Sequence, residues 1–179
     1  MTKLVLVSSL LVLFANPSWA IMIDDTSAGL QNGTDVGVVD TYINSVTGLS
    51  NSSPTTETTW VNSVLSSSAI TTTFVVKDDP VRYYETDTAN TFAFSMTSTA
   101  DYFVIKNATY WALYRNQNDL GWGVFDPTLL PSGMNLSSGT TISHVSQFNS
   151  TSVPEPSTTL LLGAGLLGFG LYSRKHSKK

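Results

Sequence analysis

Ser143 and His144 are the first residues in the sequence whose types and spacing could do chemistry. A serine and a histidine form the nucleophile and base of many hydrolases, but catalysis requires the two side chains to face each other, whereas neighbours on a strand point to opposite faces. The chain also has no Gly-x-Ser-x-Gly motif. We therefore predict a structural role for His144, no catalytic residue and no enzyme activity.

A short acidic stretch is the second candidate. It contains Asp78, Asp79, Glu85 and Asp87, whose carboxylate oxygens are the ligand type that Ca²⁺ prefers. Their spacing lacks the glycine and the terminal glutamate of an EF-hand loop, so a solvated acidic loop is the favoured interpretation, with calcium as the alternative. A glycosidase pair would need a fixed separation of about 5–9 Å between carboxyl groups, which a sequence does not specify. One histidine and no cysteine before the tail do not make a zinc site. No metal and no cofactor are predicted.

Aromatic residues are a third candidate, because exposed tryptophan and tyrosine rings stack on sugars. Most aromatic side chains on sheets form core, however. The alternative function is therefore a carbohydrate-binding module, with extracellular polysaccharide as its partner and a platform made of Tyr110, Trp111 and Trp122. Sequons for glycosylation begin at Asn32, Asn51, Asn107, Asn135 and Asn149.

The elements that must position these residues change type along the chain. Apolar spacing of three and four residues predicts two short helices, one on Val39, Tyr42, Ile43 and Val46, the other on Trp60, Val61, Val64 and Leu65. From Ile70 onward the pattern predicts strands, with a tight hairpin at Asn107-Ala108. The expected strands are Thr71–Val76, Val81–Tyr84, Thr91–Thr97, Tyr102–Lys106, Thr109–Tyr114, Trp122–Phe125 and Thr140–Phe148. The predicted fold class is mainly β: a single antiparallel sandwich or jelly-roll-like ectodomain, with short N-terminal helices.

Charge and cysteine content exclude several classes of protein. Residues 21–153 hold twelve acidic residues against four basic ones, a net charge of −8. Nucleic-acid binding requires clustered lysine and arginine, so it is excluded as a function. The chain has no cysteine, so its core must hold the fold without disulfides. The length between the two ends suits one Ser/Thr-rich domain, residues 21–152.

The N-terminal segment has the layout of a secretory signal peptide. Lys3 precedes the apolar run Leu4–Phe14, and the small residues Ser18 and Ala20 follow it. We expect residues 1–20 to be removed by cleavage between Ala20 and Ile21.

The C-terminal segment has three parts. Pro154-Glu155-Pro156 lies within residues 153–157, and its prolines keep the backbone extended. An uncharged apolar run, residues 158–172, is the predicted transmembrane helix; it is shorter than the ~20 residues that a bilayer core needs. The basic end, residues 173–179, is expected to stay in the cytoplasm. Its charged residues are Arg174, Lys175, Lys178 and Lys179.

This order of Val153-Pro154-Glu155-Pro156, apolar helix and basic cluster resembles the PEP-CTERM sorting signal. The resemblance implies recognition and processing by an exosortase, a transient membrane anchor, and delivery to the cell surface or exopolysaccharide matrix of a Gram-negative bacterium, with a structural or interaction role in biofilm. The alternative is an ordinary C-terminal membrane tail. Residues 100–148 are also similar to the C-terminal half of many PEP-CTERM ectodomains, a likeness that supplies no activity.

Overall fold

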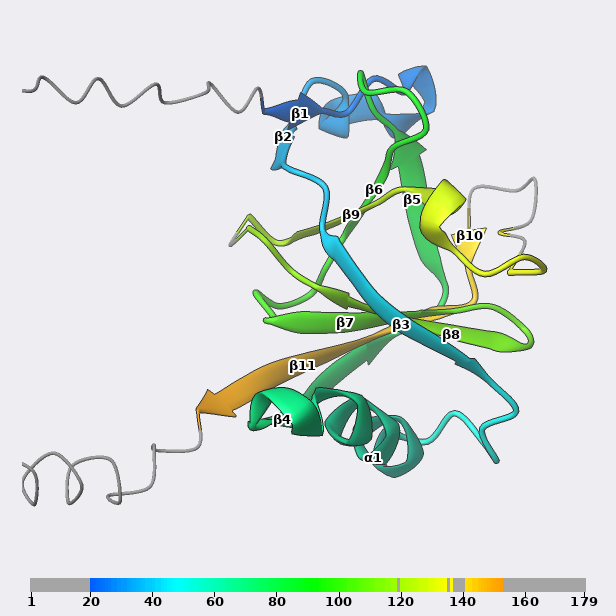
Figure 1. The fold of residues 1–179 in the computed structure, drawn as a ribbon. Coiled ribbons are helices and arrows are strands. Elements are labelled where there is room, and N and C mark those ends of the chain that lie inside the picture. Colours follow the sequence, from blue (N-terminus) through cyan, green and yellow to red (C-terminus); the bar gives the residue numbers. More distant parts are fainter. Residues whose placement is uncertain (1–19, 119, 135, 137–140, 153–179) are drawn as a thin grey trace, which may run out of the picture.

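Two antiparallel sheets pack face to face in the computed structural model, which describes residues 20–118, 120–134, 136 and 141–152 (Figure 1). The larger sheet has five strands in the order β3 (Thr41–Thr47), β8 (Tyr110–Arg115), β7 (Tyr102–Lys106), β11 (His144–Ser152) and β4 (Ile70–Asp78). The smaller sheet has four strands in the order β10 (Thr141–Ile142), β5 (Val81–Glu85), β6 (Phe92–Ser95) and β9 (Trp122–Phe125). The mainly β, antiparallel fold class predicted from the sequence is confirmed.

Four layers are stacked in the molecule, as Figure 1 shows from top to bottom. A small pair of strands, β1 (Ile21–Met22) and β2 (Asp35–Gly37), covers the outer face of the four-stranded sheet, and the helix α1 (Pro54–Leu65) covers the outer face of the five-stranded sheet. The central core lies between the two sheets and includes Phe94, Phe103 and Phe125, all fully buried. Short 3-10 helices occupy Thr26–Gln31, Ser66–Ser68 and Pro127–Leu129.

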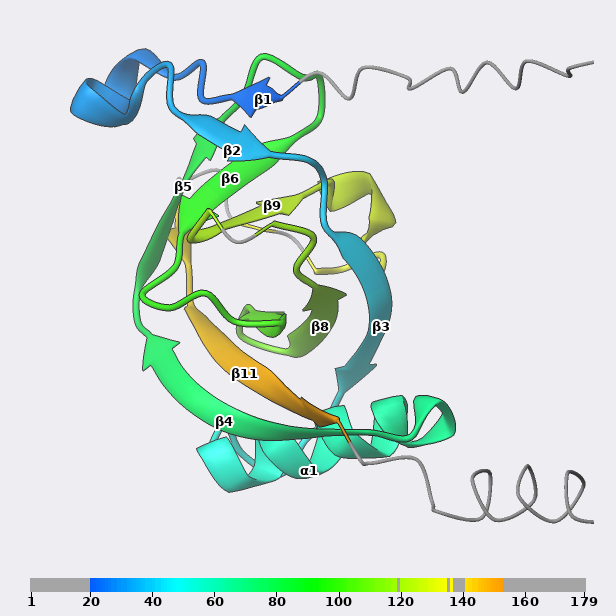
Figure 2. The ribbon, with the colours of Figure 1, turned by 90° about the vertical axis from the view of Figure 1, so that its left-hand side faces the viewer.

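Two chain segments pass directly from one sheet to the other (Figure 2). β4 continues into β5 across Asp79-Pro80, and β10 continues into β11 through Ser143. The sequence pattern predicted one strand over Thr140–Phe148, but the structure divides this stretch at Ser143 and places the two pieces in different sheets. The other strands expected from Thr71 to Phe125 agree with β4 to β9 within a few residues.

The helix α1 begins at a well-formed N-cap. The Ser53 side chain accepts a hydrogen bond from the backbone N–H of Thr56, and Pro54 occupies the first turn, where a missing N–H does no harm. Residues Glu57, Val61 and Leu65 recur at a spacing of four and form the buried face. This confirms the helix predicted around Trp60 to Leu65.

The first predicted helix, over Val39 to Val46, is wrong, because this segment forms the edge strand β3. Its register against β8 shifts between Tyr42 and Asn44, so Ile43 is an extra residue in the ladder. The bulge lets Ile43 and Val46, three residues apart, both pack with the core under α1, while Tyr42 packs in the core between the sheets. A bulged strand thus produced the spacing that is typical of a helix.

The predicted targeting segments lie outside the described residues. They are residues 1–19 of the signal peptide, and the sorting tail from residue 153 with its predicted transmembrane helix. The predicted cleavage site, between Ala20 and Ile21, lies at the first described residues. In the part of the chain that the structure describes, no helix is long and apolar enough to cross a membrane.

Candidate functional site

Glu57, on the first turn of α1, is the centre of a buried polar cluster. Its Oε1 accepts hydrogen bonds from Trp111 Nε1 and from His144 Nε2, each at 2.9 Å, and its Oε2 accepts one from Ser146 Oγ at 2.5 Å. Lys77 Nζ lies 3.7 Å from Oε2 and also donates to the Ser52 carbonyl. Because a carboxylate can only accept, the ring nitrogen of His144 that faces it carries the proton.

The five-stranded sheet presents these partners on the face that α1 covers. His144 and Ser146 are two residues apart on β11, so both point toward the helix. Along the sheet, His144 is opposite Lys106 on β7, and Lys106 is opposite Trp111 on β8. The Lys106 ammonium lies 4.8 Å from the centre of the Trp111 ring, in a cation–π contact. The alignment of the strands therefore places two cations and three hydrogen-bond donors beneath the Glu57 carboxylate. The cations are Lys77 and Lys106, and the donors are Trp111, His144 and Ser146.

The charge of Glu57 is stabilised although its side chain is fully buried. Burial alone would raise its pKa, but the hydrogen bonds from His144, Ser146 and Trp111 together outweigh burial and hold the pKa of Glu57 below its ordinary value. Burial lowers the pKa of the Lys106 ammonium, while the nearby Glu57 carboxylate acts in the opposite direction. In this cluster the hydrogen bonds and opposite charges offset the free-energy cost of burying charged groups, and they do so only while every member keeps its partner.

The cluster does not have the geometry of a catalytic triad. In a triad the serine donates to the histidine and the histidine to the acid, whereas here Ser146 and His144 both donate to Glu57. Glu57 and Ser146 have no exposed surface, and His144 is 4% exposed. A substrate has no access to these atoms, so what the cluster can do is dock α1 onto the sheet.

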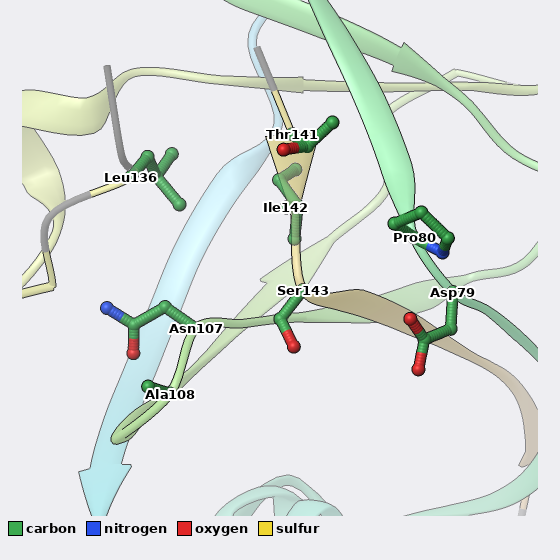
Figure 3. A pocket seen from close by; sticks show the side chains of 8 residues that line it. All are labelled: Asp79, Pro80, Asn107, Ala108, Leu136, Thr141, Ile142 and Ser143. Atoms are coloured by element: carbon green, nitrogen blue, oxygen red, sulfur yellow. The ribbon is translucent and has the colours of Figure 1, made fainter. Parts of the chain in front are cut away.

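The structure separates Ser143 from His144. Ser143 is exposed and lines a pocket of about 320 Å³, whereas His144 is buried on the α1 side of the sheet. Figure 3 shows the pocket, which lies between the start of β5, the β7–β8 hairpin and β10. Its polar side chains include Asp79, Asn107 and Thr141. The pair that suggested a hydrolase is therefore not assembled there.

The four acidic candidates also do not converge. Asp78 accepts hydrogen bonds from Thr97 and Gln147, and Asp87 accepts one from the backbone N–H of Met22. Asp79 lines the pocket, and Glu85 is exposed at the end of β5. Among the described residues, no group of three or more histidine, cysteine or acidic side chains is arranged to hold a metal ion.

Two of the three aromatic candidates for glycan contact are buried. Trp111 is 5% exposed with its N–H bonded to Glu57, and Trp122 is 8% exposed beneath the β1–β2 layer. Tyr110 is partly exposed, and its hydroxyl donates to the Ser132 carbonyl. A sugar platform requires open ring faces on one surface, and these three rings do not provide one. The aromatic residues form core, which was the favoured interpretation of the sequence.

The end of β11 is where the described structure meets the predicted sorting tail. Ser152 is paired with Ile70 of β4 and is the last residue of the strand. The residues of the predicted sorting motif, Val153-Pro154-Glu155-Pro156, follow at once in the sequence. The tail is therefore attached to a strand inside the five-stranded sheet, between β7 and β4, without an intervening linker.

Three acidic residues make long-range contacts that the sequence pattern did not predict: Glu57, Asp40 and Asp101. Glu57 had a detectable signal, since it shares the apolar face of α1 with Val61 and Leu65 at a spacing of four. A charged residue at a core-facing position of a helix indicates a buried partner. Asp40 and Asp101 precede strands and had no such signal.

Comparison with known proteins gives one match. The model of the PEP-CTERM protein-sorting motif matches residues 152–175. No curated protein and no solved structure matches the chain. The matched segment begins at the last residue of β11, and it contains the Pro-Glu-Pro sequence, the apolar run and the first two basic residues, Arg174 and Lys175.

Proposed function

From its PEP-CTERM sorting motif, which implies export, membrane anchoring and processing by an exosortase, we propose that the chain is a non-enzymatic protein of the cell surface or exopolysaccharide matrix of a Gram-negative bacterium. The tail holds the domain at the membrane after export. The exosortase then processes it at Pro154-Glu155-Pro156, and the β domain is delivered outside, where it has a structural or interaction role. The match at residues 152–175 is the observation that carries this proposal.

The domain itself supports a role without catalysis. The buried polar cluster around Glu57 is covered by α1 and satisfied by internal partners. Two of the four lysines and arginines between residues 21 and 152, Lys77 and Lys106, are directed into this cluster. The rest of residues 21–152 is acidic and rich in serine and threonine. Such a composition keeps a protein soluble outside the cell and suits contacts with hydrated polymers rather than with anionic ones.

The proposal is tested by Glu155→Ala in a host with an active exosortase, with the intact mass of the mature protein as the readout. We expect wild-type protein to lose residues C-terminal to the motif, and the variant to retain its C-terminus at Lys179 because the enzyme no longer recognises the tail. Glu85→Ala is the matched control, since it removes the same side chain from an exposed position on β5. Normal processing of Glu155→Ala, or a wild-type protein that retains Lys179, would refute the proposal.

A further inference from the structure

The strand that carries the tail is secured up to its last residue. On one side, β11 pairs with β4 from Val145 to Ser152. On the other side, pairing with β7 ends at Phe148, and Asp101 then continues the attachment, because its Oδ2 accepts hydrogen bonds from Ser150 N and Ser150 Oγ, both at 2.7 Å. Thr151 Oγ1 also donates to the Thr71 carbonyl at 3.1 Å. The end of β11 is thus held from both sides.

This attachment limits how far the sorting motif can extend from the domain. Three residues lead from Ser152 to Glu155, and a chain of three residues spans at most about 11 Å in any conformation. One α-helix with its side chains is about 10–12 Å across. One helix of an enzyme that surrounds Glu155 would therefore take up the whole distance between Glu155 and the sheet. An enzyme that encloses Glu155 must touch the domain while β11 stays paired.

We propose that the end of the five-stranded sheet where β11 leaves the fold is the surface that contacts the exosortase during processing. We call this surface the exit rim and define it as Ser66–Thr71, Asp101 and Ser150–Thr151. The inference rests on the proposed function and adds to it the part of the domain that the enzyme must accommodate. The tail alone specifies the destination, and the exit rim decides which folded domains fit the enzyme.

The chemistry of the exit rim agrees with a protein partner rather than a lipid surface. The side chains of Ser66, Ser67, Ser68, Thr71, Asp101 and Thr151 are exposed there. They are small and hydroxylic, apart from one carboxylate, and none is basic. Binding to anionic lipid depends on clustered lysine and arginine, whereas small hydroxyl-bearing side chains allow close approach and hydrogen bonding by a protein.

The test uses the full chain in a host with its exosortase and follows the rate of tail processing in a pulse-chase experiment. Ser67→Arg places a large charged side chain on the exit rim. Ser50→Arg is the matched control, because Ser50 is exposed in the loop before α1, at the opposite end of the helix from Ser67. A second background carries about eight inserted Gly and Ser residues after Ser152, which add a reach of up to about 29 Å.

We expect Ser67→Arg to slow processing several-fold at native spacing, Ser50→Arg to have no effect, and the insertion to restore the rate of Ser67→Arg to that of its parent. Wild-type processing of Ser67→Arg, or slow processing that persists with the insertion, would overturn the inference.

Asp101→Ala tests the rival explanation, in which the end of β11 detaches from the sheet and so lets Glu155 reach further from the domain. The variant releases Ser150, and faster processing of it would show that β11 detaches in this way. If Glu155→Ala is blocked while Ser67→Arg behaves as wild type, the exit rim fails and the proposed function stands. If Glu155→Ala is processed normally, the proposed function itself fails.

Discussion

Replacing Glu57 tests whether the buried cluster holds α1 on the sheet. Glu57→Gln keeps the shape of the side chain but leaves a single acceptor oxygen and removes the charge that faces Lys77 and His144. Glu57→Ala removes every acceptor and leaves the N–H groups of Trp111 and His144 and the hydroxyl of Ser146 buried without their partner. The alanine variant should therefore be the less stable of the two.

The expected magnitudes follow from the bonds that are lost. A hydrogen bond to a charged group contributes about 1.5–3 kcal/mol, and removing one partner of a buried ion pair costs about 3–5 kcal/mol. Because these contributions overlap, we expect a loss of about 3 kcal/mol for Glu57→Gln and about 5 kcal/mol for Glu57→Ala. A domain of this size is stable by only about 5–15 kcal/mol, so the alanine variant will be close to unfolding.

Acid titration gives the second signature of Glu57. The pKa of Glu57 in the fold lies below its ordinary value of 4.5, so below that value the unfolded chain binds more protons than the folded one. The stabilisation is fully present above pH 5 and is lost as the pH falls through the pKa of the folded state. Glu57→Gln has no proton to bind at this site, so this part of the acid sensitivity should disappear.

The measurement is urea unfolding of residues 21–152, followed by tryptophan fluorescence, from pH 3 to pH 8. Glu85→Gln is the control, because Glu85 is exposed on β5 and surface substitutions usually change stability by less than about 0.5 kcal/mol. If Glu57→Gln matched Glu85→Gln at pH 7, or if its stability fell in acid as steeply as that of the wild type, the reasoning about the cluster would be refuted.

Two further predictions concern buried polar groups outside the cluster. Burial raises the pKa of Asp40 to about 7, although its oxygens accept hydrogen bonds from the backbone N–H groups of Gln117 and Val124. Between pH 4 and pH 7 the folded state therefore binds more protons than the unfolded chain, so the free energy of unfolding should fall by up to about 4 kcal/mol as the pH rises through this window. Urea unfolding measures this slope, which Asp40→Asn should abolish. The Tyr114 hydroxyl is buried with no hydrogen-bond partner among the described residues, so Tyr114→Phe should stabilise the domain by about 1 kcal/mol, measured by thermal unfolding. Tyr42→Phe is the control, because it loses a hydrogen bond to Ser45 and should destabilise the domain.

The sequence predicted strands well where a strand is a short, mostly apolar run. Strands β7 and β9 match their predicted bounds, because Tyr102–Lys106 and Trp122–Phe125 are short runs that are buried throughout. It failed where a local irregularity breaks the alternation of side chains. The bulge at Ile43 gave β3 the spacing of a helix, and Ser143 divides one apparent strand between two sheets. Such irregularities are set by neighbouring strands, which a single segment does not reveal.

The polar network was harder to predict for a different reason. Glu57 and His144 are 87 residues apart, and only the register of β11, β7 and β8 brings His144, Ser146 and Trp111 to one face under α1. Periodicity predicts which residues share a face of one element, but it contains no information on how two elements are aligned. The sorting motif is the opposite case, because its recognition depends on a contiguous segment and the sequence alone sufficed to find it.

The strand β11 takes part in the buried polar network and also leads directly into the sorting motif. Its first residues, His144 and Ser146, are held by Glu57, its middle residue Gln147 donates to Asp78, and its end is held by Asp101. Polar side chains from the helix, from a neighbouring strand and from the residue before β7 thus all contact the strand that continues into the tail. Because hydrogen bonds on both flanks must break together before β11 can leave the sheet, the fold keeps the tail attached to an intact domain. Loss of Glu57 should therefore loosen the very strand that presents the motif, and the Glu57→Gln variant should expose the backbone amides of β11 to hydrogen exchange before those of β5 and β6.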